Sequence, residues 1–125
     1  MALGLSVVAC SGLQRCASGQ QAMLNSLLYF GTAQPTGVVS DEQWQAFVND
    51  SIVLRFPDGF TVWPATGQWR DAAGQPVREA SFVLNLVHPA NDETSQALKA
   101  ITARYKERFQ QEAVLHVQSG VCVAW

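Results

Sequence analysis

The sequence has 125 residues, enough for one domain and too few for a second hydrophobic core beside the first. Charged residues make up only 14% of the chain, against roughly 25% in ordinary soluble domains, while 48% are hydrophobic, so intrinsic disorder is excluded. A formal net charge of −2, with eight Lys and Arg residues that form no cluster, excludes nucleic acid as the main partner.

The first forty residues contain a single charged side chain, Arg15. Residues 1–9, MALGLSVVA, have the length of the apolar region of a signal peptide, although no basic residue precedes them. The small residues before Cys10 resemble the processing site of bacterial lipoproteins, whose first cysteine carries a lipid. We therefore expect residues 1–9 to be a lipoprotein signal, Cys10 to be lipidated and residues 10–22 to be a polar leader. A secretory signal that is cut later, or a buried first element, is the alternative.

The sequence has three cysteines, so in an exported protein two can pair in a disulfide and one thiol remains to be explained. If Cys10 carries the lipid, Cys16 and Cys122 remain as a candidate disulfide, which requires an oxidising compartment. A free Cys122 buried in a strand is the alternative. The Cys and His spacings fit no zinc motif, so we expect neither a metal nor another cofactor. The expected location is the periplasmic side of the bacterial cell envelope, with Ser11 directing a lipid anchor to the outer membrane as the only membrane contact.

Residues 23–125 predict one domain that starts with a strand and a helix. Residues 23–30 are apolar on both faces of a strand. The helix begins after Ser40, whose side chain can form a capping box with Gln43. Its apolar stripe consists of Trp44, Phe47, Val48 and Ser51 or Ile52. Residues 56–59, FPDG, end the helix because a residue before proline is disfavoured in the α region.

The middle of the chain predicts a strand followed by a hairpin. Residues 60–63 form the strand, and Pro64–Thr66 interrupt it. Residues 67–70 and 77–79 flank the turn-forming segment 71–74, so we expect an extra hairpin there.

The last third of the chain predicts a strand, a helix and a final strand. Residues 80–87 alternate, and one face of that strand carries Phe82, Leu84, Leu86 and His88. The helix is expected over residues 92–111. Its buried stripe consists of Leu98, Ile101, Tyr105 and Phe109. The final strand covers residues 114–117 and 121–125, with a bend at Ser119-Gly120.

This β-α-β-β-α-β order predicts an α+β, ferredoxin-like fold, in which two helices cover one face of a four-stranded antiparallel sheet. The second face should then be polar, yet the first strand places Leu28 and Phe30 on one face and Leu27 and Tyr29 on the other. An apolar second face indicates an interface or a cavity. We expect a homodimer or another protein partner to stack on it, or a pocket to form there.

Three short motifs carry a family resemblance. They are FPDG followed by FTV in residues 56–62, GQWRD in residues 67–71 and the Arg78-Glu79 pair. With the segment through Tyr105 and residues 109–114, they resemble the domain of unknown function 3574 family of short, exported proteins of Gram-negative bacteria. The resemblance covers residues 22–125 and implies an exported protein.

Polar residues near the hairpin suggest a site. Trp69, Arg70, Arg78 and Glu79 could bind an anion, although a cross-strand ion pair that fixes the hairpin register is favoured. His88, at a strand end, is either a general base or, as favoured, a neutral side chain bonded to local backbone.

His116 should point opposite Leu115 and Val117, and it could form an acid/base cluster with Tyr29 and Glu79. The candidate ligand-binding residues are Tyr29, Trp69, Arg70, Glu79 and His88. No catalytic motif is present.

Two functions follow from these observations. The first is an envelope-localised, non-enzymatic binding domain that acts through its sheet face. The second is a small-molecule enzyme or binder resembling dimeric α/β-barrel proteins, whose pocket lies between stacked sheets. The residues expected to line that pocket are Tyr29, Phe82, Leu84 and Trp125.

Overall fold

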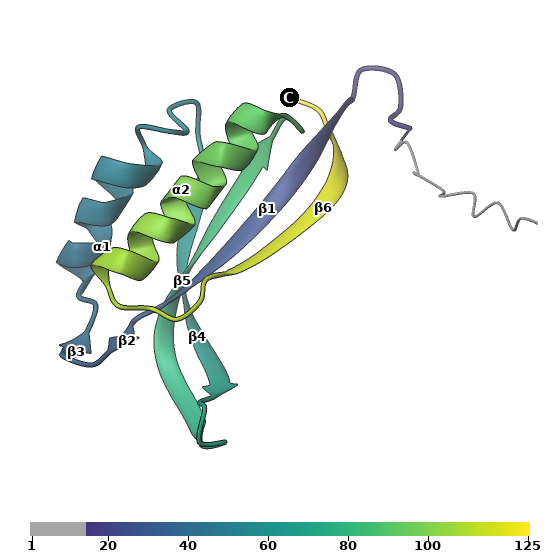
Figure 1. Ribbon diagram of the computed structural model, residues 1–125. Coiled ribbons are helices and arrows are strands. Elements are labelled where there is room, and N and C mark those ends of the chain that lie inside the picture. The colour runs from purple at the N-terminus through teal and green to yellow at the C-terminus, as the bar shows by residue number, and fades with distance from the viewer. Residues whose placement is uncertain (1–14) are drawn as a thin grey trace, which may run out of the picture.

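A computed structural model of the protein describes residues 15–125 (Figure 1). Its elements are β1 (Gln21–Gly31), β2 (Ala33–Gln34), β3 (Gly37–Val38), α1 (Asp41–Phe47), the π-helical turn η1 (Val48–Ile52), β4 (Thr61–Arg70), β5 (Pro76–His88), α2 (Asp92–Arg108) and β6 (Leu115–Val123). The expected signal segment and Cys10 lie outside the described residues. In the described part, no helix is long and apolar enough to cross a membrane.

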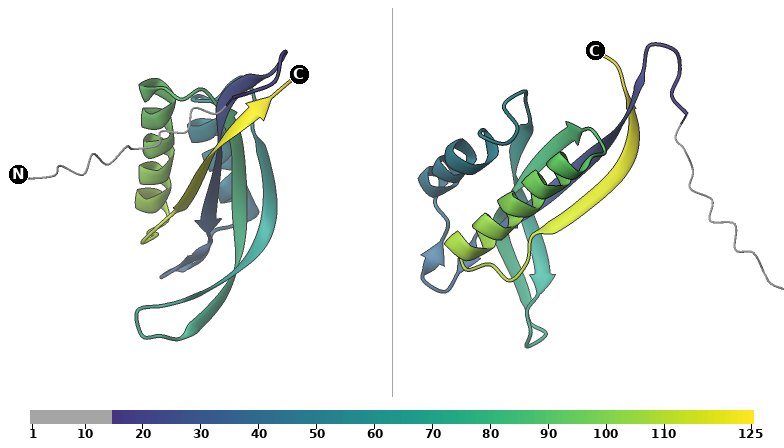
Figure 2. Two further views of the ribbon diagram at one scale, coloured as in Figure 1. Left: turned by 90° about the vertical axis from the view of Figure 1, so that its right-hand side faces the viewer. Right: turned by 45° about the horizontal axis from the view of Figure 1, so that its top comes forward.

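The main sheet has the strand order β4-β5-β1-β6, with every neighbouring pair antiparallel. Both helices pack on the same face of this sheet, and Figure 2 shows the other face bare. The predicted ferredoxin-like fold is therefore confirmed. β1 begins two residues earlier than expected, at Gln21, and the short strands β2 and β3 form a separate small hairpin.

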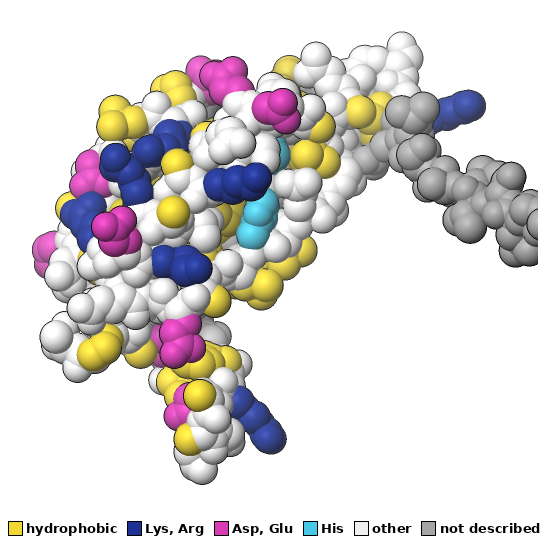
Figure 3. Space-filling view, viewed as in Figure 1, with side chains coloured by type: hydrophobic (Ala, Val, Ile, Leu, Met, Phe, Trp, Pro, Cys, Tyr) yellow, Lys and Arg dark blue, Asp and Glu magenta, His cyan; other side chains and the backbone are white. Residues whose placement is uncertain are grey.

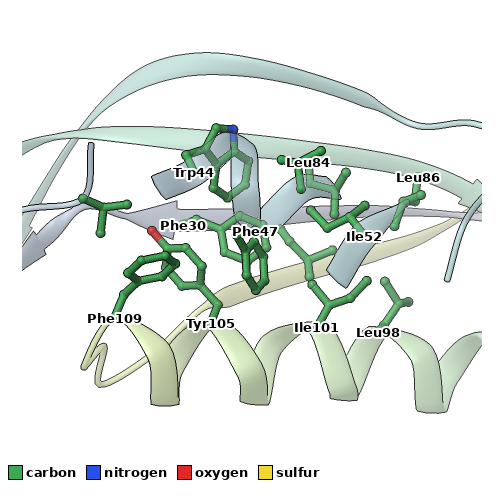
Figure 4. Close-up of a cluster of buried hydrophobic side chains, with 13 residues drawn as sticks. Phe30, Trp44, Phe47, Ile52, Leu84, Leu86, Leu98, Ile101, Tyr105 and Phe109 are labelled. Carbon is green, nitrogen blue, oxygen red and sulfur yellow. The ribbon is translucent and has the colours of Figure 1, made fainter. Parts of the chain in front are cut away.

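The hydrophobic core lies between the helices and the sheet, as Figure 4 shows. Strand alternation points Leu28 and Phe30 of β1 toward the helices, and both side chains are fully buried. Phe30 meets Tyr105 of α2 with ring centroids 4.7 Å apart, and Trp44 of α1 stacks on Phe82 at 4.4 Å. Both apolar helix stripes predicted from the sequence are buried here.

The helix starts follow the expected capping chemistry. The Ser40 hydroxyl accepts a hydrogen bond from the backbone N–H of Gln43, and the Gln43 side chain accepts one from the backbone N–H of Ser40. The side-chain oxygen of Asn91 caps α2 by accepting a hydrogen bond from the backbone N–H of Thr94. α2 ends at Arg108, three residues earlier than predicted, because Gln110 adopts a left-handed φ of 52°.

The expected interruption at Pro64–Thr66 is wrong, since β4 runs through these residues without a break. β4 is an edge strand, where the N–H that proline lacks is not needed by a second neighbour. The hairpin around residues 71–74 is therefore the projecting end of β4 and β5, visible at the foot of Figure 1.

The expected bend at Ser119-Gly120 is also wrong. β6 pairs with β1 in one constant register from Gln21 opposite Val123 to Tyr29 opposite Leu115, and Gly120 stays in the ladder opposite Leu24. A disulfide joins Cys122 of β6 to Cys16, which ties the segment before β1 to the end of the sheet.

Candidate functional site

The sheet face that the helices leave bare carries large apolar side chains. We define the open face as the side chains that strand alternation points away from the helices: Met23, Asn25, Leu27 and Tyr29 of β1, Thr61, Trp63 and Ala65 of β4, Ser81, Val83, Asn85 and Val87 of β5, and Leu115, Val117, Ser119 and Val121 of β6. Its exposed large hydrophobic members are Tyr29 (38%), Val87 (39%), Trp63 (41%), Val117 (44%) and Leu115 (61%).

The members named above include no Asp, Glu, Lys or Arg, although the same alternation also points Glu79 of β5 and Trp69 of β4 to this side, toward the hairpin end of the two strands. Near its centre, the amide nitrogen of Asn85 donates a hydrogen bond to the side-chain oxygen of Asn25 across β5 and β1, at 2.6 Å. Trp63 and Tyr29 flank Val83 in the register, and Val83 is only 2% exposed. The open face is thus an uncharged apolar surface with one amide pair.

A second cluster surrounds Glu79 at the base of the projecting hairpin. One carboxylate oxygen accepts hydrogen bonds from the backbone N–H groups of Thr32 (3.1 Å) and Ala33 (2.7 Å), and the other accepts one from the indole N–H of Trp69 (2.7 Å). A Cβ atom on Gly31 would lie 2.7 Å from a Glu79 oxygen, so a larger residue there would displace the carboxylate from this position.

The predicted cross-strand ion pair between an arginine of the hairpin and Glu79 is wrong. Within residues 15–125, neither Arg70 nor Arg78 forms a salt bridge with Glu79. Strand alternation explains this result, because Arg70 and Arg78 point to one side of the hairpin while Glu79 and Trp69 point to the other. The carboxylate instead fixes the hairpin to the start of β2.

A third cluster lies on the helix side of the sheet. The fully buried hydroxyl of Ser26 is hydrogen bonded to Nε2 of His88 at 2.7 Å and to Nε2 of His116 at 2.8 Å. Nδ1 of His88 lies 2.9 Å from the carbonyl oxygen of Pro89. A carbonyl only accepts, so Nδ1 of His88 carries a proton. His88 is thus bonded to local backbone, and additionally to Ser26.

The protonation of this cluster follows from those contacts. In neutral His88 the remaining nitrogen, Nε2, is an acceptor, so Ser26 donates its hydroxyl proton to it. The Ser26 oxygen then accepts a hydrogen bond from Nε2–H of His116. Burial lowers the pKa of His116, and a positive charge on nearby His88 would lower it further. His116 is therefore neutral at pH 7, with its proton held on Nε2.

The candidate residues do not form one site. Trp69 and Glu79 meet, Arg70 lies on the other side of the hairpin, Tyr29 lies on the open face, and His88 lies on the helix side. The expected cluster of His116 with Tyr29 and Glu79 is wrong, because His116 pairs in register with Leu28 and shares the helix side with it.

The expected pocket lining is also wrong. Phe82 and Leu84 belong to the helix-side core, Tyr29 faces the opposite way, and Trp125 is 94% exposed beyond the end of β6. Sequence reasoning missed Ser26, since a serine within an apolar strand carries no signal for two histidines 62 and 90 residues away. Among the described residues, no group of three His, Cys, Asp or Glu side chains could hold a metal ion.

Replacing Glu79 tests the bonding at the hairpin base. Glu79→Gln places an amide N–H against donor groups, and we expect the free energy of unfolding in urea to fall by about 1–3 kcal/mol. Arg78→Gln, one residue away and exposed without a side-chain partner, is the matched control and should leave stability within about 0.5 kcal/mol. Equal unfolding midpoints for the two variants would contradict this role of Glu79.

Solved structures share this architecture. A phage SAM lyase in complex with S-methyl-5'-thioadenosine is 15% identical, with a TM-score of 0.62 over 90% of this chain and 95% of that one. A phage SAM lyase in the apo state is 16% identical, with a TM-score of 0.60 over 90% of this chain and 96% of that one. CutA from Synechococcus elongatus PCC7942 is 12% identical, with a TM-score of 0.56 over 86% and 87%. At these identities the likeness shows the fold alone.

The sequence itself points to one family. No curated protein matches the chain. A family model described as a protein of unknown function (DUF3574) matches residues 25–125, which include the FPDG and GQWRD motifs. Because this match spans well over half of the sequence, the chain belongs to the DUF3574 family.

Proposed function

We propose that the protein is an envelope-localised, lipid-anchored domain that acts by binding rather than catalysis, and that a second copy of the chain is the occupant of its open face. The observation that carries this proposal is the uncharged apolar surface that both helices leave bare (Figure 2). Exposed apolar patches of this kind mark interaction sites on soluble domains.

The chemistry of the open face favours a second copy over other occupants. The central part of the open face, from residues 81–87 of β5 to residues 115–121 of β6, has no charged side chains, so it meets its own copy without like-charge repulsion and offers nothing to steer a charged partner. Asn25 and Asn85 place an amide pair near the centre, and amide groups can both donate and accept across a two-fold axis.

The size of the open face also fits self-association. Four strands about 4.8 Å apart, over a length of about 30 Å, give a projected area of roughly 550 Å². Side-chain relief makes the accessible area larger, so the face is comparable with the roughly 800 Å² per partner that a standard stable interface buries.

An enzymatic role has weaker support. The phage SAM lyase indicates that a chain of this fold can hold a small molecule, yet its identity to this chain is only 15%. The four residues expected to line a pocket between stacked sheets do not converge. The binding role therefore agrees better with the geometry.

The proposed location rests on the cysteines. A disulfide between Cys16 and Cys122 forms and persists in an oxidising compartment such as the periplasm. Pairing of these two cysteines leaves Cys10 as the remaining cysteine in the sequence, next to the lipoprotein-like signal. Both features support export followed by lipidation.

Self-association is tested with a charge on the open face. Val87 and Val53 are both 39% exposed, but only Val87 lies on the open face, and its strand is central rather than at an edge. We expect the wild-type protein to sediment as a dimer, V87E as a monomer with retained circular dichroism, and V53E as a dimer. A monomeric wild-type protein, or dimers of equal affinity in all three proteins, would contradict the proposal.

The location is tested by mass spectrometry of protein expressed from its natural gene. We expect intact protein from the membrane fraction to carry a diacylglyceryl group on Cys10. Cys16 and Cys122 should resist thiol alkylation until a reductant is added. An unprocessed chain in the cytosol with three alkylated cysteines would overturn the export proposal.

A further inference from the structure

A groove between α2 and β6 lies on the side of the sheet opposite the open face. Its larger hollow, about 300 Å³, is lined by Ser95, Leu98, Lys99, Thr102, Ala103, Lys106, His116 and Gln118. A neighbouring hollow of about 220 Å³ shares Ser95 and Gln118 and extends to His88. The larger hollow reaches the lower end of the volumes usual for small-molecule sites.

The walls of the larger hollow are basic. Lys99 and Lys106 are two helical turns apart, so they line the same side of α2. No acidic side chain lines this hollow, while Asp92 lines the neighbouring one. Figure 3 shows histidine side chains at the surface beside basic side chains on the side of the molecule that carries α2 and β6. In a chain with a net charge of −2, this local excess of positive charge favours an anion.

The floor of the groove is fixed by the serine–histidine cluster. Nε2–H of His116 donates to Ser26, which holds the imidazole in one orientation and one tautomer. His116 lines the larger hollow, and among the described residues its Nδ1 has no hydrogen-bond partner. With the proton on Nε2, this Nδ1 is an acceptor that suits a hydroxyl donor.

We propose that the groove binds a small molecule that carries both an oxyanion and a hydroxyl group. Lys99 and Lys106 pair with the oxyanion, and Nδ1 of His116 accepts a hydrogen bond from the hydroxyl. Ser26 and His88 act as positioning residues because they fix the imidazole of His116. Phosphate and carboxylate share the chemistry that the lysines recognise, and the test separates the two.

Titrations followed by the side-chain resonances of His116 test this site. The probes are glycerol 3-phosphate and glycerate, which join a hydroxyl to a phosphate or to a carboxylate, and glycerol, which has no charge. We expect saturable shifts with at least one of the two anions and none with glycerol. Saturation with one anion alone identifies phosphate or carboxylate as the preferred group.

Two variants distinguish a specific binding site from nonspecific electrostatic attraction. The double variant K99Q/K106Q should keep its melting temperature and raise the Kd of the effective anion about tenfold or more. Arg104→Gln removes an exposed charge from the same helix outside the groove, and it should leave the Kd within about twofold. The proposal would be overturned if neither anion gave a saturable shift. It would also be overturned if K99Q/K106Q and Arg104→Gln raised the Kd equally.

Discussion

Two helices can cover only one face of a four-stranded sheet, and this constraint governs the rest of the molecule. α1 and α2 cover one side of β1, where Ser26, Leu28 and Phe30 are fully buried. The same strand directs Leu27 and Tyr29 to the side that no element of the described chain covers (Figure 2). Because side chains alternate strictly along a strand, no adjustment of the helices can bury both sets. A strand that is apolar on both faces therefore leaves one apolar face that the described residues do not cover.

The parts of the fold that follow from local chemistry could be predicted from the sequence. The Ser40 and Gln43 capping box, the helical stripe that ends at Phe109 and the alternation of β5 depend on neighbours a few residues away. The errors came from long-range context. Pro64 resembles a strand break until its strand is known to lie at an edge, and the two backbone partners of Glu79 lie 46 and 47 residues away in the chain. The role of Ser26 depends on its hydrogen bonds to two histidines that are distant in the sequence and that the sheet places beside it.

The two proposed binding surfaces lie on opposite sides of the same strand. Ser26 belongs to the helix side of β1, where it holds His116 at the floor of the groove. Asn25 and Leu27, its neighbours in sequence, belong to the open face. Self-association through the open face therefore leaves the groove accessible. A ligand in the groove likewise leaves the open face uncovered. The envelope location that we propose would hold the domain at a membrane surface, where both faces can be used.

The central claim is that a second copy covers the open face, and a soluble paramagnetic probe tests it directly through methyl relaxation. At concentrations where the protein is associated, we expect the methyl groups of Val87, Leu115 and Val117 to be protected from the probe, although the single chain leaves them 39–61% exposed. Leu54, which is 73% exposed away from the sheet, should relax strongly in the same sample. Relaxation of all four methyl sets in proportion to their exposure in the single chain would contradict the account.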